Sequence, residues 1–182
     1  DNLLLNFKPW TIDPANEVYY APAGIHVNHF NLAYKQSGLA IQSETPQPNS
    51  PINININQFL ISDITSLLNK DTLLAKGIIN GKVKISEFDK VMPSFVGDIT
   101  MDSLYYKNQA IGNLGIHTQK ENENTISGNV SLTGNENNVT LKGNYYLNNL
   151  DKQFDADLNI VHFNIASLQG FSNGNISNAQ GG

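Results

Sequence analysis

The stretch Ile126-Ser127-Gly128-Asn129-Val130-Ser131-Leu132 alternates apolar or small residues with polar ones. After the polar segment 134–138 the pattern returns in Val139-Thr140-Leu141-Lys142-Gly143-Asn144-Tyr145. Side chains two positions apart lie on the same face of a β-strand, so each stretch predicts a strand with one apolar and one wet face. Because the connection is short and polar, we expect the two strands to be antiparallel neighbours.

The same alternation extends outward along the chain. It appears over 79–85 and again over 154–160, where aliphatic residues alternate with Asn, Lys or Asp. Polar segments at 107–109, 120–124 and 148–152 separate the runs and are rich in turn-forming residues. The pattern therefore predicts an all-β fold in which the strands form a mostly antiparallel meander.

One change of phase interrupts the alternation. Ile99 and Met101 occupy odd positions, whereas Leu104 and Tyr106 occupy even ones. A shift of one residue would turn every later side chain to the other face, so we expect a β-bulge or kink near Ser103 to absorb it.

The first sixty residues are less regular. Short strands are expected at Val18–Tyr20, Phe30–Tyr34 and Leu39–Ile41, and a clean one at Ile52–Ile56, with a loop at Thr45–Pro51. Two segments of the chain depart from the alternating pattern of strands.

The two exceptions are 63–69 and 164–170, where an N-cap type of residue precedes apolar residues at helical spacing. Each predicts a short helix. Similar strands precede them, and similar glycine-containing segments follow at 77–81 and 174–178, which indicates an internal repeat. We therefore interpret the chain as a single fragment of a repeat β domain, with opening strands over 1–62, one β-repeat over 63–163 with short helices at its seams, and the start of the next repeat over 164–182.

Composition excludes several classes of function. The 182 residues carry a net charge of −5, with 11 basic residues spread singly along the chain, so a nucleic-acid interface is not expected. There is no Cys, which excludes disulfides, thiolate metal sites and Cys nucleophiles. No apolar run approaches the roughly 18 residues of a membrane span, and no signal peptide is evident. Both ends read as cuts made in a longer protein.

No pattern of catalytic or metal-binding residues stands out. His26 and His29 are three apart and would point to opposite faces of a strand, so they cannot readily share a metal. Asp98 and Asp102 share a face, but alternation favours a solvated polar surface over acid–base chemistry. We predict no enzymatic activity, no metal and no cofactor.

Parity within each strand predicts instead one continuous apolar strip, far larger than soluble proteins normally expose. Such a strip is covered by a second sheet layer, by a partner or by lipid. Its predicted members, taken as candidates for lipid contact, are Ile79, Val83, Ile85, Ile99, Met101, Val130, Leu132, Val139, Leu141, Leu158 and Ile160.

The order of several weak motifs along the chain resembles the TamB family, within the AsmA-like group of Gram-negative envelope proteins. The resemblance spans essentially the whole chain. Its motifs are Trp10-Thr11-Ile12-Asp13-Pro14 with Ile25-His26-Val27 and Phe30-Asn31-Leu32, Pro51-Ile52-Asn53-Ile54 through Asp63-Ile64, Leu73-Leu74-Ala75-Lys76-Gly77-Ile78-Ile79-Asn80-Gly81, Val139-Thr140-Leu141-Lys142-Gly143-Asn144-Tyr145-Tyr146, and Leu158-Asn159-Ile160 through Gly174-Asn175-Ile176.

The resemblance implies an elongated sheet rolled into a half-open groove, often described as a β-taco. It also implies a periplasmic location, as part of a longer inner-membrane-anchored protein. Family function implies outer-membrane biogenesis: the groove binds or conducts phospholipid acyl chains between the two membranes. It implies in addition support for outer-membrane protein assembly and secretion, with a BamA-like barrel as partner.

Two other functions stay open from the residues alone. One is a chaperone-like module that lends strand edges to outer-membrane protein precursors by β-augmentation. The other is an extracellular adhesin or glycan-binding β domain, in which exposed Tyr and Asn contact sugars. The sequence leaves open which lipid is handled, the direction of transport, whether the groove is open or closed, and the oligomeric state.

Overall fold

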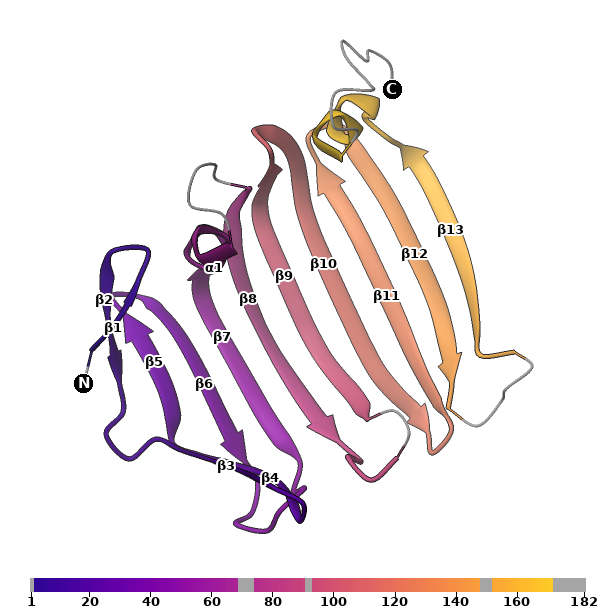
Figure 1. Cartoon of the computed structure of the whole chain (residues 1–182). Helices are drawn as coiled ribbons and strands as arrows, with labels where there is room; N and C mark the ends of the chain where they lie inside the picture. Colours follow the sequence, from indigo (N-terminus) through magenta and orange to yellow (C-terminus); the bar gives the residue numbers. More distant parts are fainter. Residues whose placement is uncertain (1, 69–73, 91–92, 148–151, 172–182) are drawn as a thin grey trace.

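The structure is a computed structural model that describes residues 2–68, 74–90, 93–147 and 152–171. Its main feature is one open antiparallel sheet of eleven strands in the order β1-β2-β5-β6-β7-β8-β9-β10-β11-β12-β13 (Figure 1). The prediction of an all-β, mostly antiparallel fold is therefore confirmed. The strands of the sheet are β1 (Asn2–Leu5), β2 (Lys8–Ile12), β5 (Phe30–Tyr34), β6 (Ser37–Ser43), β7 (Ile52–Leu60), β8 (Ala75–Ser86), β9 (Ser94–Tyr106), β10 (Gln109–Asn122), β11 (Thr125–Gly134), β12 (Asn137–Tyr146) and β13 (Phe154–His162).

Two further strands leave the meander near its start. β3 (Glu17–Ala21) and β4 (Gly24–Asn28) form a separate hairpin, so β2 pairs with β5 rather than with the next strand along the chain. The hairpin is held against β6, because the backbone N–H of Val27 donates to the Ser43 hydroxyl at 3.0 Å and both residues are buried. The sequence prediction missed the strands β1 and β2, because apolar and polar residues do not alternate regularly in this region.

Two short helices lie at the same end of the strands (Figure 1). The α-helix α1 (Ile61–Leu68) follows β7, and the 3-10 helix η1 (Ile165–Phe171) follows β13. Both overlap the segments for which short helices are predicted. Their equivalence as seams of a repeat stays a prediction, and its segment 174–178 lies outside the described residues.

The predicted irregularity at Ser103 is present in β9. Ile78 of β8 lies opposite Asp102, whereas Lys76 lies opposite Tyr105, so β9 holds one extra residue at this point. Ser103 itself has a φ of 51°. This bulge keeps Leu104 on the same face as Met101.

Tight turns explain why the long strands pair in register. Lys107 and Asn108 have φ values of 46° and 66°, and Asn135 and Glu136 have 48° and 60°. Two consecutive positive φ angles are characteristic of type I′ hairpin turns, whose twist matches that of the strands they join.

The buried core lies at the N-terminal part of the sheet, around Trp10, Leu32 and Phe59. The ring centroids of Trp10 and Phe59 are 5.0 Å apart, although β5 and β6 separate their strands in the sheet. Four flat strands would place the outer two about 14 Å apart. The sheet therefore curls between β2 and β7, with the face that carries these rings on the inside.

An ion pair attaches α1 to the start of the chain. Lys8 Nζ lies 2.6 Å from Asp63 Oδ1, and the same oxygen accepts a hydrogen bond from the Asn6 side chain. Asp63 is fully buried, so its pairing with Lys8 offsets much of the cost of burying a carboxylate.

Candidate functional site

Strand register brings all eleven predicted lipid-contact residues to one face of the sheet. Residues directly opposite each other in paired strands share a face. The first row of such partners, from β8 to β13, is Ile79, Met101, Leu114, Leu132, Val139 and Ile160. The second row is Gly81, Ile99, Ile116, Val130, Leu141 and Leu158. Val83 and Ile85 complete the set on β8, opposite Gly97 and Phe95.

None of these eleven residues is buried within the described part of the chain. Eight are half-buried by their neighbours in the sheet, while Leu141, Leu158 and Ile160 are 40%, 61% and 54% exposed. No second layer of described residues covers the apolar face over β12 and β13. Within the described residues, the apolar face over β12 and β13 is thus an aliphatic surface open to solvent.

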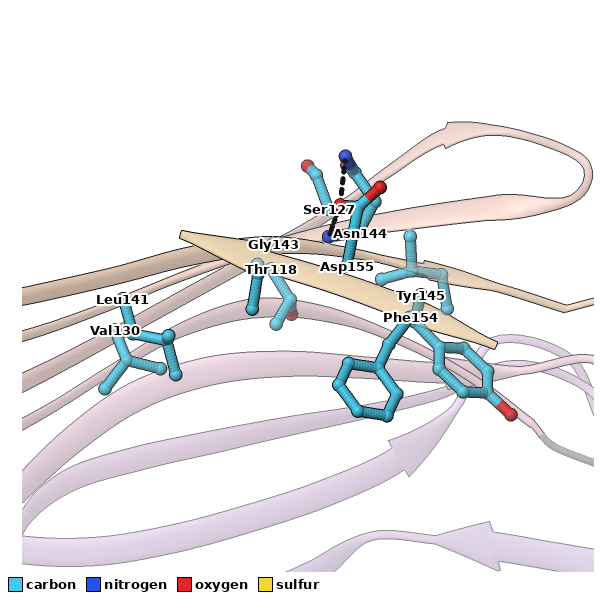
Figure 2. Close-up of a pocket in the computed structure, with 12 residues that line it drawn as sticks. Thr118, Ser127, Val130, Leu141, Gly143, Asn144, Tyr145, Phe154 and Asp155 are labelled. Atoms are coloured by element: carbon cyan, nitrogen blue, oxygen red, sulfur yellow. Dashed lines mark hydrogen bonds between the residues drawn. The ribbon is translucent and has the colours of Figure 1, made fainter. Parts of the chain in front are cut away.

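A hollow of about 270 Å³ marks this surface over β10 to β13. Figure 2 shows Val130 and Leu141 at one end and Tyr145 and Phe154 at the other, all on the same side of the sheet. Its full lining is Thr118, Ile126, Ser127, Gly128, Val130, Leu141, Gly143, Asn144, Tyr145, Phe154, Asp155 and Ala156.

The floor of the hollow is made by small residues that lie in one row across the strands. Thr118 is opposite Gly128, Gly128 is opposite Gly143, and Gly143 is opposite Ala156. The neighbouring rows carry larger side chains, namely Val130 with Leu141, and Tyr145 with Phe154. The hollow therefore lies between two rows of larger side chains.

The opposite face is polar and carries charges of both signs. One row of cross-strand partners reads Lys82, Asp98, His117, Asn129, Lys142 and Asp157. His117 Nδ1 lies 2.6 Å from Asp98 Oδ1, and this hydrogen bond, with a weaker one to Gln119, raises the pKa of His117 above its usual 6.5. A second hollow, of about 350 Å³, lies among the polar side chains over Gly128 and Gly143.

A small cluster of charges borders the apolar face at β10. Lys120 is opposite Ile126, which lines the apolar hollow, so it shares that face. Its Nζ lies 2.5 Å from Glu87 Oε1, which also accepts a hydrogen bond from Lys90. The hydrogen bond from Lys120, followed by the weaker effect of the one from Lys90, lowers the pKa of the Glu87 carboxyl below its usual value. Lys120 is therefore paired rather than free to attract an anion.

The other candidates from the sequence do not assemble into a site. His26 lies in β4 and His29 just beyond it. Within the described ranges, no three His, Asp or Glu side chains are grouped closely enough to hold a metal ion. No helix among the described residues is both long and apolar enough to cross a membrane.

Several members of the apolar face were missing from the sequence prediction. Leu114 and Ile116 alternate as the other members do, and this signal in 112–118 could have identified them. Gly128 and Gly143 stand within the alternating runs, but nothing in those runs indicates that the two glycines lie opposite each other. Their alignment depends on register, which is a property of the paired strands.

Comparisons with known proteins identify no relative of this chain: no family model, no curated protein and no solved structure matches it.

Proposed function

We propose that this chain is a non-enzymatic, lipid-handling segment of an envelope protein of the TamB type. Its apolar face binds acyl chains of phospholipid within a half-open groove, and phospholipid moves along it between the inner and outer membranes. Periplasmic location, inner-membrane anchoring and a BamA-like partner in outer-membrane protein assembly belong to the same proposal, and rest on the resemblance of the motifs.

The observation that carries the proposal is the register of β8 to β13. It places all eleven predicted apolar residues on one face and leaves Leu141, Leu158 and Ile160 exposed. Removing such surface from water is worth about 25 cal/mol per Å². Acyl chains would cover this apolar surface without needing specific polar contacts. The curl around Trp10 supports a sheet that wraps around the same face.

The composition of the apolar face also suits a transported lipid, which has to dissociate from each position along it. Over β11 to β13 the face is made of aliphatic, aromatic and glycine residues, with no charged side chain in its rows to hold a head group. Each contact is weak and nonspecific, so a lipid can shift from one row to the next. The polar heads stay in water at the rim.

The test compares Leu141→Arg on the apolar face with Lys142→Ala on the wet face. Leu141 is partly exposed, so the arginine stem can lie along the sheet while its guanidinium reaches water, and the fold should survive. Binding of a fluorescent phospholipid should fall by roughly tenfold, equivalent to about 1.4 kcal/mol. Lys142→Ala should bind as the wild type does.

Circular dichroism and urea unfolding establish that both variants are folded. A folded Leu141→Arg chain with unchanged lipid affinity contradicts the proposal. If the variant unfolds instead, the face is the interior of a closed sandwich, because burying an unpaired charge costs several kcal/mol.

A further inference from the structure

β13 is an edge strand of the described sheet, and most of its length lacks the features that usually protect an edge. Natural edge strands are shortened, bulged, or interrupted by lysine or proline. β13 is nine residues long, contains neither lysine nor proline, and pairs in regular register from Phe154 to Ile160. One extra residue shifts the register between Ile160 and His162, at the C-terminal end of the strand. Among the described residues, no strand pairs with its outer side. The other edge strand, β1, has only four residues.

The hydrogen bond at the start of β13 defines which backbone groups face outward. Tyr146 N–H donates to the Gln153 carbonyl at 2.8 Å, and these two residues are directly opposite each other. Bonded and non-bonded pairs alternate along an antiparallel ladder, so Asp155 and Asp157 also bond toward β12. The N–H and C=O groups of Phe154, Ala156, Leu158 and Ile160 therefore point away from the sheet.

The side chains of β13 indicate which residues a complementary strand should have. Phe154, Leu158 and Ile160 extend the apolar face to the very edge. On the wet face, the Asp157 carboxylate has no hydrogen bond or ion pair with any described residue. Lys142 is its cross-strand partner on β12, and a cationic side chain opposite Asp157 on the outer side would complement it in the same way.

The wet row that ends at Asp157 supports the same charge. From Lys82 it alternates through Asp98 and His117, and after the neutral Asn129 it continues with Lys142 and Asp157. A positive residue in a neighbouring strand would continue this order.

We propose that the outer edge of β13 binds one extended polypeptide strand that alternates basic and aliphatic residues. The strand adds to the sheet by backbone hydrogen bonds to Phe154, Ala156, Leu158 and Ile160. It places a basic residue opposite Asp157 and aliphatic residues on the apolar face. The proposal concerns the edge of the sheet and does not depend on lipid binding.

The experiment uses dye-labelled peptides matched to the nine residues of β13, with blocked termini. One alternates lysine and valine, one alternates glutamate and valine, and one contains the lysines and valines in two blocks. Fluorescence anisotropy should give an affinity for the alternating lysine peptide about tenfold higher than for either control. Equal binding of the block peptide would mean nonspecific attraction to the negatively charged chain, and would overturn the proposal.

Proline variants locate the binding to this edge. Leu158→Pro removes an outward N–H but no bond to β12, so the chain should stay folded, as prolines on edge strands do. It should lose about tenfold in peptide affinity, whereas Leu158→Ala, which keeps the N–H, should lose much less. Ala156→Pro provides a second outward position should Leu158→Pro not fold.

Asp157→Asn should reduce the preference for the lysine peptide over the glutamate peptide while leaving backbone pairing intact. Unchanged affinity in both folded proline variants, or no binding of the alternating lysine peptide to the wild type, would overturn the proposal.

Discussion

Gly128 and Gly143 lie directly opposite each other on β11 and β12, yet their surroundings differ sharply. A Cβ added at Gly128 would meet nothing closer than the Thr118 methyl group at 3.9 Å. The same atom at Gly143 would lie 2.3 Å from the Asp155 carbonyl oxygen. Gly143 is therefore required by the approach of β13, whereas the space at Gly128 is open and forms part of the hollow.

This difference predicts that substitution by alanine will have opposite effects on stability at the two glycines. Gly128→Ala should be neutral or stabilise the fold by up to about 1 kcal/mol, because alanine restricts the unfolded chain. Gly143→Ala should destabilise it by roughly 1–3 kcal/mol, since β13 has to shift. Urea unfolding of the two variants measures both values, and equal effects would contradict the geometry.

Filling the hollow should weaken lipid binding without unfolding the chain. In Gly128→Leu the new side chain occupies the space between the Val130–Leu141 and Tyr145–Phe154 rows, and so excludes an acyl chain from it. We expect a loss of roughly fivefold in phospholipid affinity, about 1 kcal/mol. Asn129→Leu, the next residue on the wet face, is the matched control and should retain its affinity. A Gly128→Leu chain that binds as the wild type does would place the lipid elsewhere on the face.

The curled core at the N-terminal part should dominate stability. Phe59 is buried against Trp10, so Phe59→Ala should cost about 3–5 kcal/mol by loss of apolar burial and formation of a cavity. Tyr20→Ala, at a largely exposed position, should stay within roughly 0.5 kcal/mol of the wild type. Denaturant unfolding tests both, and a small loss for Phe59→Ala would indicate that the rings do not close the curl.

Asn137 should hold η1 against the sheet. Its buried amide donates to the Ile111 carbonyl at 2.9 Å and to the Ser167 hydroxyl at 3.0 Å, and its oxygen accepts from the Asn164 N–H at 2.8 Å. Asn137→Ala removes these three hydrogen bonds and should cost roughly 2–3 kcal/mol. Ser167 keeps longer hydrogen bonds, to the Ala110 carbonyl at 3.4 Å and from the Asn135 amide at 3.5 Å. Exposed Asn138 provides the control: Asn138→Ala should change stability little. Hydrogen exchange should show η1 opening in Asn137→Ala, and unchanged protection would contradict the role.

The His117–Asp98 pair should give a small pH dependence. Because Asp98 raises the pKa of His117, folding favours the protonated ring, so the stabilisation is fully present below the unfolded value near 6.5. It is lost as pH rises through the raised pKa of the folded state. Both side chains are well exposed, so solvent screening keeps the effect small. An NMR titration should show the pKa of His117 falling toward 6.5 in Asp98→Asn, and an unchanged pKa would rule out the pair.

The alternation of Ile126 to Leu132 and of Val139 to Tyr145 was sufficient to predict strands, their apolar faces and the hairpin between them. The phase change around Ser103 was sufficient to predict a bulge. These features are local, because the pleat alone sends successive side chains to opposite faces and a single extra residue reverses them. The same reasoning identified eleven members of the apolar face, but not Leu114 and Ile116.

Contacts between residues far apart in the sequence could not be predicted from the alternation and depend on the tertiary structure. Pairing of β2 with β5, contact of Trp10 with Phe59 and alignment of Gly128 with Gly143 all join residues whose relationship depends on which strands meet and in what register. The curl likewise brings Trp10 and Phe59 together across two intervening strands, so no single strand encodes it. The sequence by itself determined which face of each strand is apolar, whereas only the folded sheet determined where that face is curled and where it is hollowed.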